Sequence, residues 1–225
     1  MKIARGQHLS VLGINGSGKS FGVRNAYLPL FQQIIVADTE EADFEDFPTV
    51  SAKRAVKLAN SKYAFAVKVP FSGSMSESDM ERLDELCYGV LRRPKDGATS
   101  TSDLPAVCVY FDEITDFSDP STIPHSLKAL IRKGRKRGIT VITATQRPQG
   151  LNKWFLSNSQ HRVYYYLSDF DSARVHDYAP FLEERMREIP YLSFRSLYQA
   201  PGGEVIVLAP IAEYDWSKRT GRKKK

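Results

Sequence analysis

One eight-residue motif near the N-terminus constrains the fold more than any other feature of the sequence. Gly13-Ile14-Asn15-Gly16-Ser17-Gly18-Lys19-Ser20 follows a short apolar segment, His8 to Leu12, and opens a helical pattern that Pro29 should end. A glycine-rich loop between a strand and a helix turns backbone N–H groups and the positive end of the helix dipole toward a phosphate. The alternative, a chance glycine-rich turn, is disfavoured by the flanking strand and helix. The motif predicts a nucleotide-binding loop.

The side chains of this loop have separate predicted tasks. Lys19 should reach the β- and γ-phosphates of ATP or a close relative, and the hydroxyl group of Ser20 should bind Mg²⁺. The residues predicted to contact the nucleotide are Gly13, Ile14, Asn15, Gly16, Ser17, Gly18, Lys19, Ser20 and Phe21.

The rest of the chain alternates short apolar runs with helical patterns. This alternation predicts an α/β fold with a central, mostly parallel sheet and helices on both faces. Strands are expected at 8–12, 33–37, 64–69, 106–111, 139–145 and 162–167, and helices at 18–28, 51–60, 80–92, 123–137, 169–178 and 181–187. The segments 192–199 and 204–208 flank Pro201-Gly202-Gly203 and predict an antiparallel hairpin at the sheet edge.

Length and composition favour one globular domain. The chain has 225 residues, of which 42% are hydrophobic, enough to form a core. It contains no apolar run long enough to span a membrane and no secretory signal pattern. Cys87 and Cys108 lie in apolar segments and are interpreted as core thiols. We expect a single domain over 1–215, with a core at 5–178 and an extension at 179–215, followed by a disordered basic tail at 216–225.

A second motif places two carboxylates at the end of a buried strand. Asp112 and Glu113 follow the apolar run from Ala106 to Phe111. We expect this strand to lie beside the phosphate-loop strand, with its carboxyl end at the nucleotide. Asp112 would then hold Mg²⁺, and Glu113 would orient or deprotonate the attacking water. The alternative is a carboxylate pair that caps the next helix.

The next buried strand ends in Thr145 and Gln146. A polar residue at this point can lie beside the γ-phosphate, so Gln146 is the candidate sensor; alternatively, it is a loop amide bound to backbone. Just before this strand lies a run of cations, Arg132-Lys133-Gly134-Arg135-Lys136-Arg137. The run either complements the negative end of a helix dipole or supplies an arginine finger to a neighbouring subunit.

Four motifs together give the chain a resemblance to the FtsK/HerA superfamily of DNA-pumping ATPases. They are the phosphate loop, the Tyr110-Phe111-Asp112-Glu113 segment, the Gly134-Arg135-Lys136-Arg137-Gly138-Ile139 segment and the Ala144-Thr145-Gln146-Arg147-Pro148 segment. The segment from Asp169 to Arg174 is similar to a later stretch of the family. None of the large additional domains of cellular members is expected within these 225 residues, and the chain resembles most the genome-packaging ATPases of icosahedral viruses with an internal membrane, especially archaeal ones.

The resemblance implies a RecA-like P-loop NTPase of the ASCE class that hydrolyses ATP with Mg²⁺. It further implies a homo-oligomeric ring, often a hexamer, acting on double-stranded DNA, in which Arg135 is the best-matched arginine finger and Arg132 and Arg137 are alternates. Capsid or internal-membrane vertex proteins are expected partners, and the host cytoplasm or the virion is the expected location. Two polar segments, 72–78 and 94–105, are candidate pore or interface loops.

Two other functions remain open at this point. One is a motor of the same superfamily that acts in plasmid transfer or in phage export. The other is a nucleotide switch or assembly factor that hydrolyses slowly and does not grip DNA. The sequence shows no motif that reads the base, so ATP is inferred over GTP from the resemblance alone.

Overall fold

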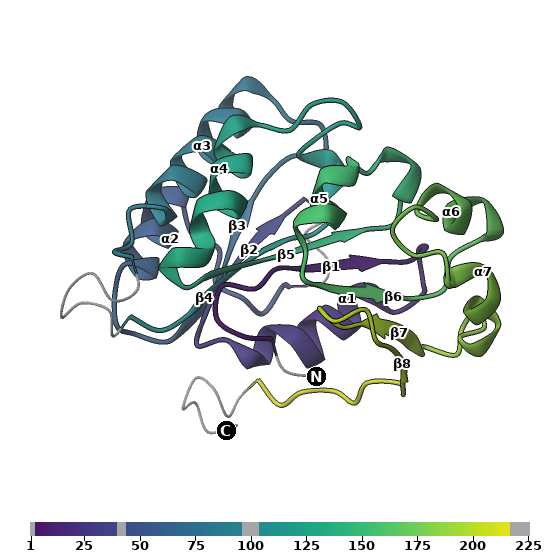
Figure 1. Ribbon diagram of the computed structural model, residues 1–225. Coiled ribbons are helices and arrows are strands. Elements are labelled where there is room, and N and C mark those ends of the chain that lie inside the picture. The colour runs from purple at the N-terminus through teal and green to yellow at the C-terminus, as the bar shows by residue number, and fades with distance from the viewer. Residues whose placement is uncertain (1–2, 40–43, 96–103, 217–225) are drawn as a thin grey trace.

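The structure is a computed structural model, and it describes residues 3–39, 44–95 and 104–216. Over these residues, eight strands form one sheet in the order β3-β2-β4-β5-β1-β6-β7-β8 (Figure 1). The strands are β1 (Leu9–Leu12), β2 (Gln33–Asp38), β3 (Phe65–Pro70), β4 (Val107–Phe111), β5 (Ile139–Thr145), β6 (His161–Tyr164), β7 (Ser196–Gln199) and β8 (Val205–Leu208). The first six strands of this order, β3, β2, β4, β5, β1 and β6, are parallel to one another. Strands β7 and β8 are antiparallel to their neighbours. The predicted mostly parallel sheet with a C-terminal hairpin is confirmed.

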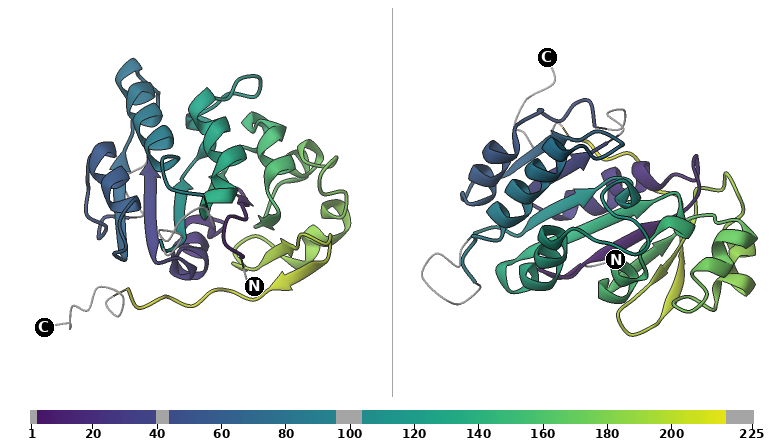
Figure 2. Two further views of the ribbon diagram at one scale, coloured as in Figure 1. Left: turned by 60° about the vertical axis from the view of Figure 1, so that its left-hand side comes forward. Right: turned by 90° about the horizontal axis from the view of Figure 1, so that it is seen from above.

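Helices cover both faces of this sheet, as the alternating pattern predicts. The described α-helices are α1 (Lys19–Gly22), α2 (Ala52–Ala59), α3 (Glu77–Val90), α4 (His125–Gly134), α5 (Lys153–Asn158), α6 (Asp169–Arg174) and α7 (Leu182–Arg185). Apolar residues of α2 to α5 pack on one face, and the helical segment that follows the phosphate loop packs on the other. Figure 2 shows these two layers from the side and from above.

One sequence prediction about strand order is wrong. Strand β4, which carries the acidic pair, does not lie directly beside β1. Strand β5 separates them: Leu9 of β1 pairs with Ile142 of β5, and Val107 of β4 pairs with Ile139 of β5. All seven residues of β5 are buried, because this strand lies in the interior of the sheet with neighbours on both sides. The Thr145 end of β5 therefore lies between the phosphate loop and the acidic pair.

Helix boundaries differ from the predictions where tertiary packing decides. The helix after the phosphate loop does not stop before Pro29. Its α-helical turn continues as a π-helical turn at Val23–Tyr27 and a 3₁₀ turn at Leu28–Leu30, in which proline occupies an early position. Proline is tolerated there because the first residues of a helical turn have no acceptor for an N–H group. Helix α6 ends at Arg174 rather than at Tyr178, because Val175 turns into the core.

The segment from Ser72 to Ser78, predicted to be a polar pore or interface loop, in part starts a helix. Ser76 caps α3: its hydroxyl accepts from the N–H of Asp79, and the Asp79 side chain accepts from the N–H of Ser76. Hydrogen bonds from Ser72 and Ser76 lower the pKa of Asp79 to about 2. In the other predicted loop, 94–105, residues 96–103 lie outside the described residues.

The C-terminal segment after β8 crosses the face that carries α1 (Figure 1, yellow). The N–H of Tyr214 donates to Oδ1 of Asn25 at 3.0 Å. Trp216, which the sequence assigns to a disordered tail, packs edge-on against Phe47 with ring centroids 5.0 Å apart. Residues 217–225 of the predicted tail lie outside the described residues.

Candidate nucleotide-binding site

The phosphate loop connects β1 to α1, as predicted, and its glycines are required by its backbone. Gly16 and Gly18 have φ angles of 72° and 94°, a region that side chains with a Cβ rarely adopt. A Cβ at Gly13 would lie 2.6 Å from the Cβ of Tyr165. The N–H of Gly13 donates to the carbonyl of Thr145 at 3.3 Å. The loop is thus attached to the carboxyl end of β5.

The predicted phosphate-binding side chains are positioned by the loop itself. Lys19 is buried, and its Nζ donates to the carbonyl oxygen of Ile14 at 3.2 Å, so the loop curls around the ammonium group. Ser20 follows directly in the first turn of α1 and is partly buried. A loop that is closed around a lysine at a helix N-terminus is suited to a polyphosphate.

Asp112 lies at the end of β4, where the sequence predicts a magnesium ligand. Its side chain is buried, and the hydroxyl of Tyr110 donates to its Oδ1 at 2.5 Å. Tyr110 and Asp112 share a face because side chains alternate along a strand. The carboxylate of Asp112 and the hydroxyl of Ser20 are hard oxygen donors, the set that Mg²⁺ takes together with phosphate oxygens and water. These residues therefore fit Mg²⁺, although no group of three His, Cys, Asp or Glu that could hold a metal occurs within the described ranges.

Glu113 is held by three hydrogen-bond donors. Its Oε1 accepts from the hydroxyl of Thr145 at 2.6 Å and from that of Thr115, and its Oε2 accepts from the N–H of Gln146 at 2.8 Å. Glu113 is 5% exposed and has a φ of 48°, left-handed backbone that a non-glycine residue seldom adopts. Such backbone is found where surrounding contacts enforce it, often at functional sites. Thr145 thus contacts the phosphate loop through its carbonyl and Glu113 through its hydroxyl.

Gln146 follows β5 directly, so the structure brings it to the same edge of the sheet as the phosphate loop and Glu113. Its backbone N–H contacts Glu113, and its side chain is partly buried. A further carboxylate, Asp116, lies close by. Burial raises the pKa of Asp116; a hydrogen bond with Thr39 opposes this shift, and the charge of Glu113 adds to it.

The basic run from Arg132 to Arg137 lies at the amino-terminal end of β5, opposite to the end that carries the phosphate loop. Arg135 and Arg137 form a 3₁₀ turn between α4 and the start of β5. Because β5 has seven residues, this turn lies about 20 Å from the phosphate loop of the same chain. Arg132 and Arg135 are exposed, whereas the partly buried Arg137 donates to the carbonyl of Arg93 at 2.5 Å. The structure does not bring these arginines to the site of their own chain.

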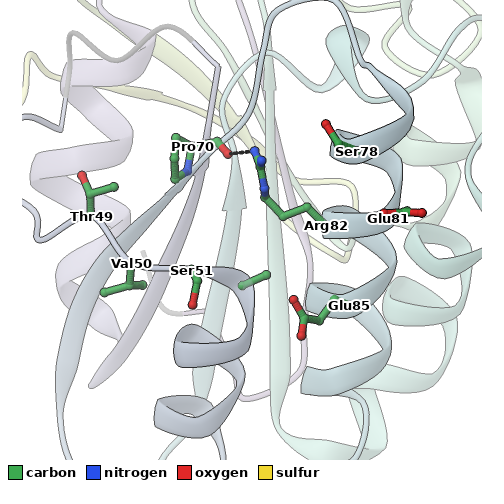
Figure 3. Close-up of a pocket in the computed structure, with 9 residues that line it drawn as sticks. Thr49, Val50, Ser51, Pro70, Ser78, Glu81, Arg82 and Glu85 are labelled. Carbon is green, nitrogen blue, oxygen red and sulfur yellow. Dashed lines mark hydrogen bonds between the residues drawn. The ribbon is translucent and has the colours of Figure 1, made fainter.

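A groove elsewhere on the molecule is not suited to a phosphate. It has a volume of about 730 Å³ and lies between α2 and α3, beside the edge strand β3 (Figure 3). Glu81 and Glu85 line it, and Arg82, its one lining cation among the described residues, points to the carbonyl of Pro70, to which it donates at 2.7 Å. The two carboxylates would repel a polyanion. In the sheet order, β2, β4 and β5 separate this groove from β1.

A second cavity, of about 380 Å³, lies beside the phosphate loop. Its lining residues come from α1 and from three later segments of the chain: Gly18, Phe21, Gly22, Tyr165, Phe194, Pro210 and Ile211. Of these, the sequence predicts only Gly18 and Phe21. It also misses Thr145 and Tyr110 as partners of the carboxylates. Strand alternation was a signal for Tyr110, which precedes Asp112 by two positions, whereas Phe194 and Ile211 carry no local signal.

The whole fold is similar to several solved structures. The genome-packaging NTPase B204 from Sulfolobus turreted icosahedral virus 2, in complex with sulfate, superposes with a TM-score of 0.73 and 13% identity, covering 93% of this chain and 98% of B204. The chain has the RecA-like P-loop NTPase fold. The conjugation coupling proteins TrwB and TcpA of pCW3 share this P-loop NTPase fold with TM-scores of 0.65 and 0.64, identities of 11% and 16%, and coverage of 93% and 95% of this chain. The match spans 86% of the truncated chain TrwBΔN70 and 62% of the TcpA chain.

Sequence comparison gives a weaker match. Protein P9 of Pseudoalteromonas phage PM2 is 27% identical over 146 residues, which are 65% of this chain and 62% of P9. No protein-family model matches the chain. In the part of the chain that the structure describes, no helix has both the length and the apolar character needed to cross a membrane.

Proposed function

We propose that this chain is an ATP-driven motor that moves double-stranded DNA and packages a viral genome into a preformed capsid. The observation that carries the ATPase part of this proposal is the arrangement around Thr145, which connects the phosphate loop at Gly13 to the carboxylate of Glu113. This arrangement places a phosphate-binding loop, a candidate metal ligand and a candidate general base at the carboxyl edge of one sheet. It suits hydrolysis of a nucleoside triphosphate.

Each residue of the site has its own role in the proposed hydrolysis. Lys19 binds the β- and γ-phosphates, Glu113 orients the attacking water, and Gln146 contacts the γ-phosphate from the end of β5. Ser20 and Asp112 would hold Mg²⁺, which supplies charge neutralisation on the phosphates. The three donors to Glu113 fix its carboxylate, which matters because catalysis of phosphoryl transfer depends mainly on positioning and electrostatics.

Coupling to DNA is supported by the fold of the relatives. B204, whose name assigns it to genome packaging, is matched over 98% of its length, whereas the conjugation protein TcpA is matched over 62%. The conjugation protein TrwB is matched over 86% of its chain with a TM-score of 0.65, against 0.73 for B204, and these figures together favour packaging over plasmid transfer. A net charge of +6 suits a polyanion partner, and contacts to the phosphate backbone carry no sequence information, as a pump requires. The candidate pore segments remain 72–78 and 94–105.

The proposed assembly is a homo-oligomeric ring, with a hexamer as the expected size. Arg135 is exposed and lies at the sheet edge away from its own phosphate loop. It is therefore proposed to act as an arginine finger in the site of a neighbouring subunit, with Arg132 as the exposed alternate. Arg137 is the weaker alternate, since it is held by the carbonyl of Arg93. The proposed location is the host cytoplasm, with capsid or vertex proteins as partners on the virion.

Measurement of ATP turnover with and without duplex DNA tests the motor. The assembled protein should hydrolyse ATP faster when duplex DNA is present, and Glu113→Gln should abolish turnover while ATP still binds. Turnover that is unchanged by DNA but lost in Glu113→Gln would leave an ATPase without DNA coupling. Slow turnover that is the same in both proteins would favour a nucleotide switch.

The second candidate is a motor for plasmid transfer, because TrwB and TcpA share the fold. Genomic context separates the two candidates. A gene for a major capsid protein beside the gene for this chain supports packaging, whereas a set of conjugation genes would overturn it and leave the DNA motor intact.

A further inference from the structure

The apolar cavity beside the phosphate loop continues the nucleotide site. Gly18 of the loop and Phe21 of α1 line it, so the cavity begins where the phosphate-binding segment ends. A cavity of about 380 Å³ lies within the range of roughly 300–1,000 Å³ that small-molecule sites occupy. Whatever is attached to phosphates on this loop therefore has an apolar space next to it.

Tyr191 and Phe194, in a loop of the C-terminal part of the chain, contact the phosphate loop. A Cβ at Gly16 would lie 3.2 Å from the hydroxyl oxygen of Tyr191, and a Cβ at Gly18 would lie 3.1 Å from Cδ1 of Phe194. The ring of Phe194 thus packs directly against the loop. Tyr191 is in turn held by Tyr166, with ring centroids 5.4 Å apart.

The backbone of this C-terminal loop is strained. Leu192 has a φ of 62° and Phe194 a φ of 53°, both in the left-handed region, where bulky side chains are uncommon. Phe194 also leaves 49% of its surface exposed, as does Phe21 on α1. Strained backbone that presents half-exposed aromatic rings beside a binding loop is a feature of ligand sites rather than of a core.

The side chains around this cavity can stack on a base but cannot read its edge. Among the described residues that line it, only Tyr165 carries a polar side-chain group, and burial raises its pKa to about 12, so its hydroxyl stays neutral. A hydroxyl group both donates and accepts, and so it does not distinguish adenine from guanine. Strong discrimination requires polar groups fixed in the site that one ligand satisfies and the other leaves unpaired, and the lining side chains that the structure describes supply none of this kind.

We propose that this cavity holds the purine base of the nucleotide by stacking on Phe194 and Phe21, and that the protein therefore accepts ATP and GTP alike. This inference rests on the proposed nucleotide site. Stacking on aromatic side chains is tolerant of base identity because every base has a π-face. Removing one ring should weaken the binding of ATP and of GTP by similar factors, of about tenfold, and leave the binding of inorganic tripolyphosphate unchanged.

Isothermal titration of the magnesium complexes of ATP, GTP and tripolyphosphate tests this proposal. The native protein should bind ATP and GTP with dissociation constants within about threefold of each other. Phe194→Ala should raise the dissociation constants of ATP and GTP by about tenfold and leave the dissociation constant of tripolyphosphate unchanged. Phe194→Trp should restore the binding of ATP and GTP. Tyr63→Ala, which removes a ring that is 76% exposed at a distance from the site, is the control and should change none of the three.

Three results would overturn the proposal: a strong preference for ATP in the native protein, an unchanged dissociation constant for ATP in Phe194→Ala, or a tripolyphosphate affinity that falls as much as that of ATP. Phe21→Ala provides the same comparison if Phe194→Ala does not fold. Lys19→Ala separates this inference from the proposed function. If Lys19→Ala binds ATP and tripolyphosphate normally, the phosphate site itself is wrong.

Discussion

The hydroxyl group of Thr145 should control the rate of hydrolysis without controlling nucleotide binding. It donates to Glu113 at 2.6 Å and accepts from the N–H of Arg147 at 2.9 Å. Valine has nearly the same shape, so Thr145→Val removes both hydrogen bonds and opens no cavity. A hydrogen bond to a charged group contributes about 1.5–3 kcal/mol. If that energy orients Glu113 in the transition state, its loss lowers kcat roughly 10- to 150-fold.

The assay is steady-state ATP hydrolysis over a range of ATP concentrations, together with the affinity for a non-hydrolysable analogue. We expect Thr145→Val to lower kcat and leave the affinity unchanged, because the phosphate loop is held by the Thr145 carbonyl, which the substitution retains. Thr145→Ser keeps the hydroxyl and should recover most of the activity. A kcat within twofold of the native value in Thr145→Val, or a loss of affinity instead of rate, would refute this role.

Three further predictions concern stability and assembly. Burial lowers the pKa of His8 to about 4, and its neutral ring accepts from the N–H of Val141 at 3.0 Å. The pKa of His8 in the unfolded chain is about 6.5, so burial of the neutral ring contributes to the free energy of unfolding above pH 6.5. This contribution is lost as the pH falls toward 4, by up to about 3 kcal/mol. Urea unfolding at pH 6.5 and at pH 4 should show that the free energy of unfolding changes less with pH in His8→Gln than in the native protein. An equal change in both proteins would contradict this role of His8. Arg93 is fully buried and donates to Gln33 at 2.9 Å and to several carbonyl groups. Arg93→Met should cost about 3 kcal/mol or more in urea unfolding, because buried acceptors lose their donor; a loss below about 1 kcal/mol would show that they find other partners. Finally, Arg135→Ala and Lys19→Ala should each be inactive alone, and mixing them should restore ATP turnover, because a ring then contains sites with both groups; no recovery would argue against an arginine finger supplied by a neighbour.

Much of the phosphate site could be predicted because its physical requirements are local. The phosphate loop needs glycines at positive φ, and Gly16 and Gly18 have it. Buried strands of a parallel sheet are continuous apolar runs, so β5 is found at Ile139–Thr145 as predicted. The caps of α2, Ser51 and Asn60, are likewise set by neighbours in the sequence.

The features that sequence reasoning missed depend on contacts between distant segments. The insertion of β5 between β1 and β4 is a property of the whole sheet, and neither adjacent strand encodes it alone. The apolar cavity combines Gly22 with Tyr165 and Ile211, which lie far apart in the chain. The π-helical turn after Gly22 forms where the Tyr165 hydroxyl contacts this glycine, and no helix propensity predicts such a contact.

The central claim is that hydrolysis at this site moves duplex DNA. Displacement of a fluorescent third strand from a duplex tests it directly, since a protein that translocates along the duplex must strip the third strand ahead of it. We predict release that requires ATP and that Glu113→Gln, which still binds ATP, does not support. A native protein that hydrolyses ATP on duplex DNA but releases the third strand no faster than Glu113→Gln would contradict the claim.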